Sequence, residues 1–191
     1  MGKGRLEAFS DGVLAIIITI MVLEIKVPHE AGWNALLPLL PIFLSYVLSF
    51  IFLGIYWNNH HHLFQAVHRI NGRVLWANLH LLFWLSLIPF ATAWMGENSF
   101  DQSAVALYGI VLLFCALAYW ILTTTLVAHH GQESLLATAL GKDVKGKISV
   151  ALYAIAIPIA FIQAWLACSL YVLVAFIWLV PDLRIEKKLM E

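Results

Sequence analysis

The sequence is short of charge, and that shortage narrows the classes of protein it can encode. Only 12% of its 191 residues are charged, the formal net charge is zero, and 62% of the residues are apolar. A soluble domain is nearer half apolar, so the composition indicates an integral membrane protein surrounded by a lipid bilayer. The balanced charge gives no electrostatic basis for binding nucleic acid, and we expect none.

Cysteines and catalytic motifs are also scarce. The two cysteines, Cys115 and Cys168, both lie inside apolar runs, and we expect them to be small buried side chains rather than metal or redox ligands. The sequence contains no paired-carboxylate site, no nucleophile with a base at suitable spacing and no phosphate-binding loop. We therefore expect neither an enzyme nor a bound cofactor or metal.

Apolar runs, by contrast, are abundant. Six segments are expected to be helices: 6–27, 36–57, 74–94, 104–127, 148–162 and 164–180. The first four can each cross a hydrocarbon core of roughly 30 Å, whereas the last two would reach only roughly 23–26 Å and could form a re-entrant pair. We favour two full crossings, and hence a single all-α domain over 1–191 with six transmembrane helices.

The basic residues predict the topology. If the N-terminus is cytoplasmic, ten of the eleven Lys and Arg residues fall on the inner side and only Lys26 falls on the outer side, as the positive-inside rule expects. The 95–103 loop holds two acids and no base, which suits an outer loop. We predict a multi-pass protein of the cell membrane with both termini in the cytoplasm.

The first segment carries an aliphatic stripe. Because each residue turns a helix by 100°, Ile16, Ile20 and Leu23 fall on one face within about 40° of Ile16, with Thr19 on its flank. Such a stripe is usually a packed or lipid-facing surface, but rings of aliphatic side chains also line pores that close by dewetting. The pattern alone does not separate these two interpretations.

Asp11 lies about 140° from Ile16 and should point into neighbouring helices. An unpaired charge in hydrocarbon is costly, so the first interpretation is a hydrogen-bonded packing anchor. Its expected donors are Arg5, Asn78, His80 and Trp84. The second interpretation is a secondary cation/proton transporter that uses Asp11 as a relay. Transporters usually have interrupted helices around a polar midplane site, and few polar side chains are expected beside Pro89 and Pro158.

Histidines cluster twice, at 60–62 and at 129–130, where two spans are expected to reach the cytoplasm. The first interpretation is interfacial polar residues at helix ends. A metal site or a pH sensor remains open, because histidine is a common metal ligand and titrates near neutral pH. His80 differs because it lies inside the third span, where we expect it to share the hydrogen-bond network of the first helix.

The opening of the first span resembles a known signature. The pattern Arg5-x-x-x-Phe9-Ser10-Asp11 is similar to the one that begins the first helix in the potassium channel family typified by the lysosomal transmembrane protein 175. The stretches "YWNNHHHLF", "NLHLLFWLSLIPF" and "WLVPDLRIEKK" agree with it more weakly. Prokaryotic members of that family are single six-helix repeats.

The resemblance implies a homotetramer in which the first helix of each subunit lines a central potassium pore. It assigns the pore constriction to Ile16, Ile20 and Leu23 and a cation contact to the Thr19 hydroxyl. It also implies a structural network that ties the first helix to its neighbours, formed by Arg5, Phe9, Ser10, Asp11, Asn78, His80 and Trp84.

Overall fold

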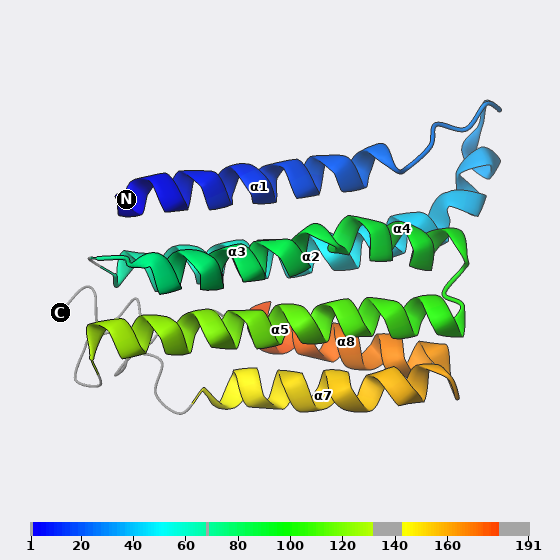
Figure 1. The fold of residues 1–191 in the computed structure, drawn as a ribbon. Coiled ribbons are helices and arrows are strands. Elements are labelled where there is room, and N and C mark those ends of the chain that lie inside the picture. Colours follow the sequence, from blue (N-terminus) through cyan, green and yellow to red (C-terminus); the bar gives the residue numbers. More distant parts are fainter. Residues whose placement is uncertain (1, 68, 132–142, 180–191) are drawn as a thin grey trace.

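The computed structural model describes residues 2–67, 69–131 and 143–179, and all regular structure within them is helical. The helices run side by side, and α3 and α4 follow one another in one direction (Figure 1). In chain order the elements are α1 (Lys3–Leu23), the 3₁₀ helix η1 (Trp33–Leu39), α2 (Leu40–Gln65), α3 (Gly72–Ser86), α4 (Ile88–Glu97), α5 (Gln102–His130), α7 (Val144–Ala160) and α8 (Ala164–Leu179).

Two helix ends differ from the sequence prediction. α1 stops at Leu23, four residues before the predicted end, because Glu24 begins a polar turn ahead of Pro28, and proline disfavours helix in the residue before it. α2 continues to Gln65, eight residues past the predicted end. The whole "YWNNHHHLF" stretch is therefore part of a helix rather than a loop.

The third predicted span consists of two consecutive helices, α3 and α4, which meet at Leu87. Pro89 has no N–H to donate to the carbonyl one turn earlier, so the regular helical ladder is interrupted there. The chain bridges the junction with the Leu87 N–H donating to the Trp84 carbonyl (3.2 Å) and the Ala91 N–H donating to the Leu87 carbonyl (3.1 Å).

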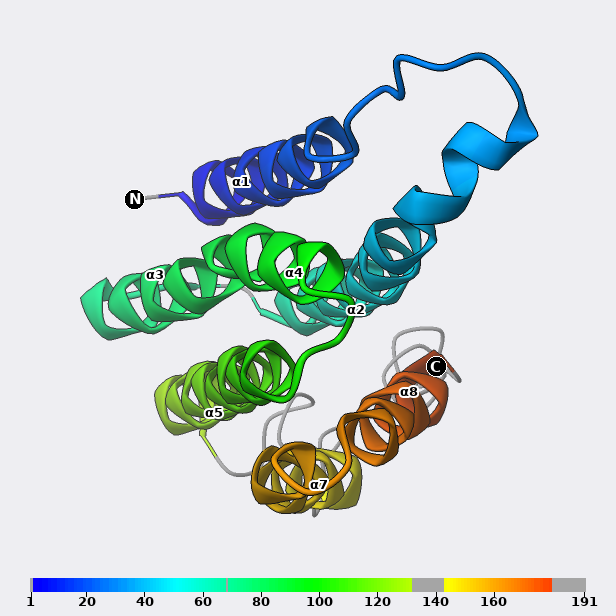
Figure 2. The same cartoon turned by 90° about the vertical axis from the view of Figure 1, so that its right-hand side faces the viewer.

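Four helical segments are long and apolar enough to cross a membrane: α1, η1 with α2, α3 with α4, and α5. The helices α7 and α8 have 17 and 16 described residues and form a hairpin. The hairpin packs against α5 rather than against α1 (Figure 2). The first four predicted spans are thus helices of sufficient length, while the last two are shorter, as the sequence indicated.

The core of the bundle is centred on α5, which packs against α3, α4, α7 and α8. Cys115 and Cys168 are buried and free, as expected. Two glycines permit close helix approach: a Cβ at Gly109 would overlap the Tyr171 ring of α8, and a Cβ at Gly96 would overlap α2. Small residues at such crossings are typical of membrane helices, which gain stability from close packing rather than from leaving water.

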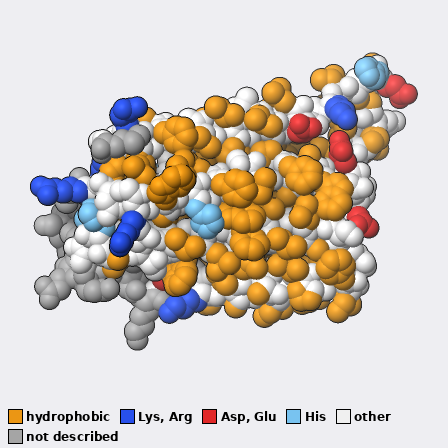
Figure 3. Space-filling view, viewed as in Figure 1, with side chains coloured by type: hydrophobic (Ala, Val, Ile, Leu, Met, Phe, Trp, Pro, Cys, Tyr) orange, Lys and Arg blue, Asp and Glu red, His pale blue; other side chains and the backbone are white. Residues whose placement is uncertain are grey.

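Charge separates to the two ends of the bundle. In Figure 3, Lys and Arg gather at the end that holds the N-terminus, and acidic side chains dominate the opposite end. At that acidic end Lys26 pairs with Glu97 (3.6 Å). The orange band between the ends is the apolar surface that a bilayer would cover.

Candidate pore-lining helix and its anchors

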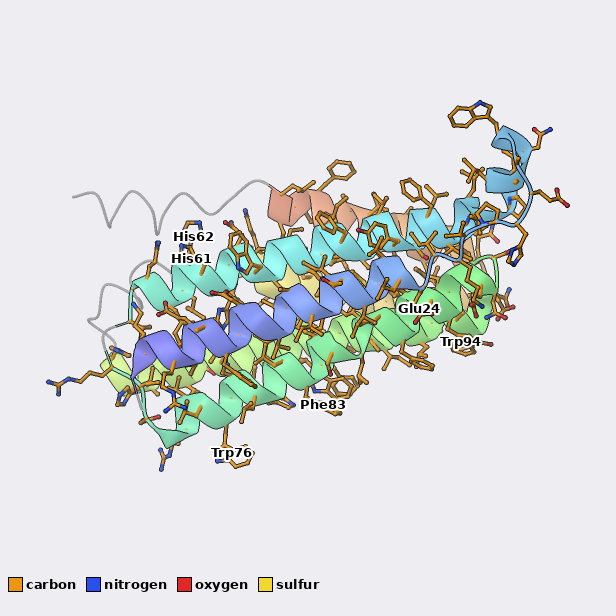
Figure 4. The ribbon with its side chains drawn as sticks, turned by 90° about the horizontal axis from the view of Figure 1, so that it is seen from above. Glu24, His61, His62, Trp76, Phe83 and Trp94 are labelled. Atoms are coloured by element: carbon orange, nitrogen blue, oxygen red, sulfur yellow. The ribbon has the colours of Figure 1, made fainter. Side chains whose placement is uncertain are left out.

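α1 has one buried face and one uncovered face. Its buried side chains follow a helical spacing and pack on α2, α3 and α4: Leu6, Ser10, Leu14, Ile17 and Met21. On the other side Ile16, Ile20 and Leu23 are 60%, 43% and 73% exposed. Figure 4 looks onto this uncovered side, with α1 lying over the rest of the bundle. The stripe derived from helical angles is therefore a free surface of the single chain.

Thr19 lies on the same uncovered side. Its hydroxyl donates to the Ala15 carbonyl (2.8 Å), one turn earlier in α1. A hydroxyl that donates its hydrogen keeps lone pairs on the oxygen. The exposed Thr19 oxygen therefore keeps acceptor capacity on the uncovered side of α1.

A groove of about 510 Å³ runs between α1 and α4. Ile16 and Ile20 form its α1 wall, while Pro89 and Phe90 form its α4 wall. Glu24, labelled in Figure 4, also lines it. Part of the aliphatic stripe therefore borders an open apolar groove in the single chain.

A buried hydrogen-bond chain ties α1 to α2 and α3. The His60 Nε2–H of α2 donates to Asn78 Oδ1 (2.8 Å), Asn78 Nδ2 of α3 donates to Ser10 Oγ (2.9 Å), and Ser10 Oγ donates to the Leu6 carbonyl (2.9 Å). His60, Asn78 and Ser10 are each at most 3% exposed. Because every member has a partner, the chain satisfies the rule that buried polar groups are hydrogen-bonded.

The Asp11 carboxylate is anchored by a donor that the sequence did not suggest. Trp57 Nε1–H of α2 donates to Asp11 Oδ1 (3.1 Å). Asp11 itself remains exposed in the single chain, at the edge of the α1–α2 contact. Asp11 was expected to be buried between helices, but within the subunit it is exposed, and its donor is Trp57 in place of the four expected residues: Arg5, Asn78, His80 and Trp84.

His80 and Trp84 lie on another face of α3. Trp84 Nε1–H donates to His80 Nε2 (3.0 Å), and the Trp84 ring stacks on Phe114 of α5 at 4.3 Å between centroids. Asn78 points to α1, whereas His80, two residues later, is turned about 200° away from it. Within the subunit these two residues are thus separate from the Ser10 and Asp11 contacts.

The remaining signature residues, Arg5 and Phe9, are both exposed on α1, and Phe9 is 52% exposed. They lie toward the N-terminal end of the stripe that Ile16 occupies. Within the subunit they thus extend the uncovered face rather than fill the core.

The structure corrects the interpretation of one histidine. His60 is buried and bonded to Asn78, whereas the sequence placed it at an exposed helix end. The available signal was spacing: Ser49, Leu53, His60 and Phe64 fall on one face once α2 extends to Gln65. The neighbouring His61 is exposed and bonds Gln65 (2.8 Å).

The second histidine cluster lies at the end of α5. His129 bonds Asn71, which caps α3 (3.0 Å), and His130 bonds the Leu126 carbonyl one turn earlier in α5 (3.0 Å). No group of three or more His, Cys, Asp or Glu residues close enough to hold a metal ion occurs within 2–67, 69–131 and 143–179.

A second polar cluster lies beside the interrupted span. Ser49 of α2 bonds both Thr92 of α4 (2.6 Å) and Tyr108 of α5 (2.9 Å), and Thr92 also donates to the Ile88 carbonyl (2.7 Å). Polar side chains therefore do sit near Pro89, contrary to the sequence interpretation. They are all buried and bonded to one another, so the cluster fastens three helices instead of forming an open binding site.

The fold and the charge separation define an α-helical integral membrane protein whose first helix is exposed along one face. Residues 5–89 match the family described as "Endosomal/lysosomal potassium channel TMEM175". A potassium channel from Chryseobacterium is 57% identical over 191 residues, covering all of both chains. The chain belongs to the TMEM175 family, which confirms the resemblance carried by the Arg5–Asp11 signature.

Two further relatives extend the comparison. The crystal structure of a lysosomal potassium-selective channel TMEM175 homolog from Chamaesiphon minutus superimposes with a TM-score of 0.81 and 31% identity, covering 94% of this chain and 97% of that one. An endosomal/lysosomal proton channel TMEM175 from Gallus gallus is 30% identical over 69% of this chain but only 30% of its own length. The match therefore spans nearly all of the Chamaesiphon chain but only 30% of the animal one.

Proposed function

We propose that this chain is the subunit of a homotetrameric potassium channel of the cell membrane, with α1 of each subunit lining a central pore. The observation that carries the proposal is the uncovered stripe on α1, together with the naming of the full-length relatives as potassium channels. Because α1 packs on its own subunit along one side, its other side is free to face the central axis of a tetramer. Ile16 and Ile20 also line the groove between α1 and α4, so this side of α1 is open toward such an axis.

Conduction would pass through the aliphatic rings. Four copies of Ile16, Ile20 and Leu23 form a throat that repels water when narrow, so opening is a matter of wetting. A potassium ion crossing it sheds part of its hydration shell, which costs less for potassium than for sodium, and Thr19 offers an oxygen beside the throat. Selectivity of this kind needs no loop of backbone carbonyls, and none is apparent in the sequence.

The membrane orientation follows the charge. The basic end of the bundle faces the cytoplasm in this proposal, because positive residues are retained on the inner side. The α7–α8 hairpin then crosses the bilayer twice alongside α5, and the six spans form a single domain. The basic residues at 142, 184, 187 and 188 and the "WLVPDLRIEKK" stretch beyond residue 179 lie outside the described residues.

The decisive test replaces Ile16, whose four copies would form one level of the throat. Ile16→Asn should wet the throat, raising potassium conductance and lowering the potassium-over-sodium permeability ratio in planar-bilayer recordings under a potassium/sodium gradient. Ile155→Asn is the matched control, because Ile155 is 52% exposed on α7, far from α1. Unchanged conductance and selectivity in Ile16→Asn tetramers would remove Ile16 from the pore.

The transporter alternative receives less support from the contacts. A relay passes a proton between groups that both donate and accept, yet the partner of Asp11 is an indole N–H, which only donates. The contact is therefore suited to anchoring. Unitary current steps would identify a channel, whereas saturating flux with counter-flow would identify a carrier.

A further inference from the structure

Two polar side chains are exposed on helices that cross the membrane, and each has an unused hydrogen-bonding atom. Asp11 lies eight residues inside α1, about 12 Å from its first residue. Its Oδ1 accepts from Trp57, and its Oδ2 has no partner within the described residues. His80 lies eight residues inside α3 and is also exposed. Ionisable side chains at such a depth usually pair with one another or line a cavity.

The tautomer of His80 makes it a hydrogen-bond donor. Trp84 Nε1–H donates to His80 Nε2 (3.0 Å), and an indole N–H cannot accept in return. His80 Nε2 therefore carries no hydrogen, and the ring hydrogen of this imidazole lies on Nδ1. The Nδ1–H has no acceptor within the part of the chain that the structure describes. The free donor on His80 thus matches the free acceptor on Asp11.

The two groups lie at the same depth in the membrane. Asn78 of α3 donates to Ser10 of α1 (2.9 Å), so these two residues are level with each other, and the two helices run in the same direction (Figure 1). Asp11 follows Ser10 by one residue, and His80 follows Asn78 by two. At 1.5 Å per residue their depths differ by about 1.5 Å.

Within one subunit, however, Asp11 and His80 are directed to different neighbours. Asp11 lies at the α1–α2 contact, where Trp57 bonds it. His80 is bonded to Trp84, whose ring stacks on Phe114 of α5. The two side chains therefore lie on different flanks of the subunit, at one depth, and a partner for each must come from outside it.

α1 has a third side, which is neither the buried face nor the aliphatic stripe. The exposed residues Ala8, Asp11 and Ala15 lie on average about 110° from the stripe and about 130° from the centre of the buried face. A helix that lines a pore in a cyclic assembly has three neighbours: the axis, its own subunit and the next subunit. The two alanines allow a helix of the next subunit to approach closely on this third side.

The outer side of α3 is the side turned away from α1, and it holds His80 between two large rings. Trp76 and Phe83 are 75% and 55% exposed, and Figure 4 shows both rings pointing out of the bundle along α3. In the register fixed by the α1–α3 hydrogen bond, Trp76 is level with Ala8 and Phe83 is level with Ala15. Each ring on α3 thus has a small residue at its own depth on α1.

We propose that the outer side of α3 packs on the third side of α1 in the next subunit, where His80 Nδ1–H donates to Asp11 Oδ2. This inference rests on the proposed tetramer and names the two surfaces that close it. Rotation about an axis along the membrane normal keeps every group at its depth, so the groups that meet must be level. The contact joins two different surfaces, as a ring requires. Its hydrogen bond is charge-assisted, because the acceptor is a carboxylate.

Cysteine pairs at matched depths test the contact. In native membranes a two-carbon bis-thiosulfonate reagent should link Ala15→Cys/Phe83→Cys subunits into a ladder of dimers, trimers and tetramers on denaturing gels. The pair Ala8→Cys/Trp76→Cys should give the same ladder. The crossed pair Ala8→Cys/Phe83→Cys, whose depths differ by about 10 Å, should give at least tenfold less linked protein. The two native cysteines are buried, so they can remain in place.

Substitutions at His80 separate the intersubunit bond from the contact with Trp84. His80→Phe should lower the tetramer fraction at least fivefold in native mass spectrometry of dilute detergent-solubilised protein. His80→Gln keeps an N–H donor and an oxygen that can accept from Trp84, so it should lose less than twofold. At a concentration where Asp11→Ala still forms some tetramer, adding His80→Phe should change nothing further. His61→Phe is the matched control, because His61 is exposed at the α2 edge, across α1 from the α3 edge (Figure 4).

Three results would overturn this interface and leave the tetramer in place. They are the lack of a ladder from both matched pairs, an equally strong ladder from the crossed pair, and losses in Asp11→Ala and His80→Phe that simply add. Failure of the proposed function has a different signature, because the unmodified protein would then show no tetramer in native mass spectrometry. That result would remove both proposals together.

Discussion

The helices α1 and α5 are similarly apolar, but α5 is surrounded by other helices and α1 is covered on one side only. Both are long enough to cross a membrane, yet 28% of the most apolar stretch of α1 is buried against 50% for α5. α5 is surrounded by α3, α4, α7 and α8, whereas α1 contacts the bundle on one side only. Hydrophobicity therefore places a helix in the membrane without saying whether protein, lipid or a pore faces it.

The two helices are also held differently. α5 is fixed by close packing, as where Tyr171 lies on Gly109 and donates to the Val105 carbonyl (3.1 Å). α1 packs along one face and is also held near its N-terminal end by polar contacts from Ser10 and Asp11. In a membrane both close packing and interhelical hydrogen bonds stabilise helix association. Because α1 packs on its own subunit along one face only, its other face stays free for another surface.

The largest loss of stability should come from adding one methyl group to α5. Gly109→Ala places a Cβ against the buried Tyr171 ring and should cost about 3 kcal/mol or prevent folding. Gly12→Ala on α1 is the matched control, because the space around Gly12 is open and alanine favours helix. Thermal melting of detergent-purified protein compares the two, and equal melting temperatures would contradict the difference between the helices.

A smaller effect is expected where α1 is anchored. Asn78→Ala leaves His60 and Ser10 buried without their partner and should lower the free energy of unfolding by about 1–2 kcal/mol. A double-mutant cycle with Ser10→Ala measures the coupling. If the losses of unfolding free energy in Asn78→Ala and Ser10→Ala simply add, the Asn78–Ser10 hydrogen bond contributes nothing, and α1 is held here by apolar packing.

Asp11→Ala should cost about 1 kcal/mol and impair tetramer assembly more than conduction. Trp57→Phe removes only the indole donor, so it should reproduce most of the loss. Size-exclusion chromatography and bilayer recording of both variants provide the measurement. An intact tetramer with altered conduction in Asp11→Ala would instead favour the relay.

The smallest effect should be at the exposed ion pair beyond α1. Lys26 and Glu97 are 78% and 49% exposed, so water and salt screen their attraction. Glu97→Gln should change stability by less than about 0.5 kcal/mol, and its melting curve should overlay that of the unmodified protein. A larger shift would mean that the α1–α4 end is held more tightly than its exposure indicates.

Much of the architecture could be predicted from the sequence because hydropathy and charge are local properties. The apolar runs predicted the helices of the bundle, and the helical angle predicted the aliphatic face of α1, although Asp11 on its other side is exposed rather than buried. Partners of polar groups could not be predicted in the same way. Trp57 and His60 were overlooked because they lie some fifty residues from α1 in the chain, on a helix that extends further than its apolar run.

The sequence by itself determined that the chain crosses a membrane, that its described Lys and Arg residues other than Lys26 lie at one end, and which face of the first helix is aliphatic. These follow from the free energy of transferring individual side chains and from the fixed turn of a helix. Only the tertiary structure decided that this face stays uncovered, which donors hold Asp11 and Ser10, and where a groove remains. Those depend on how distant helices meet, and no local pattern encodes that packing.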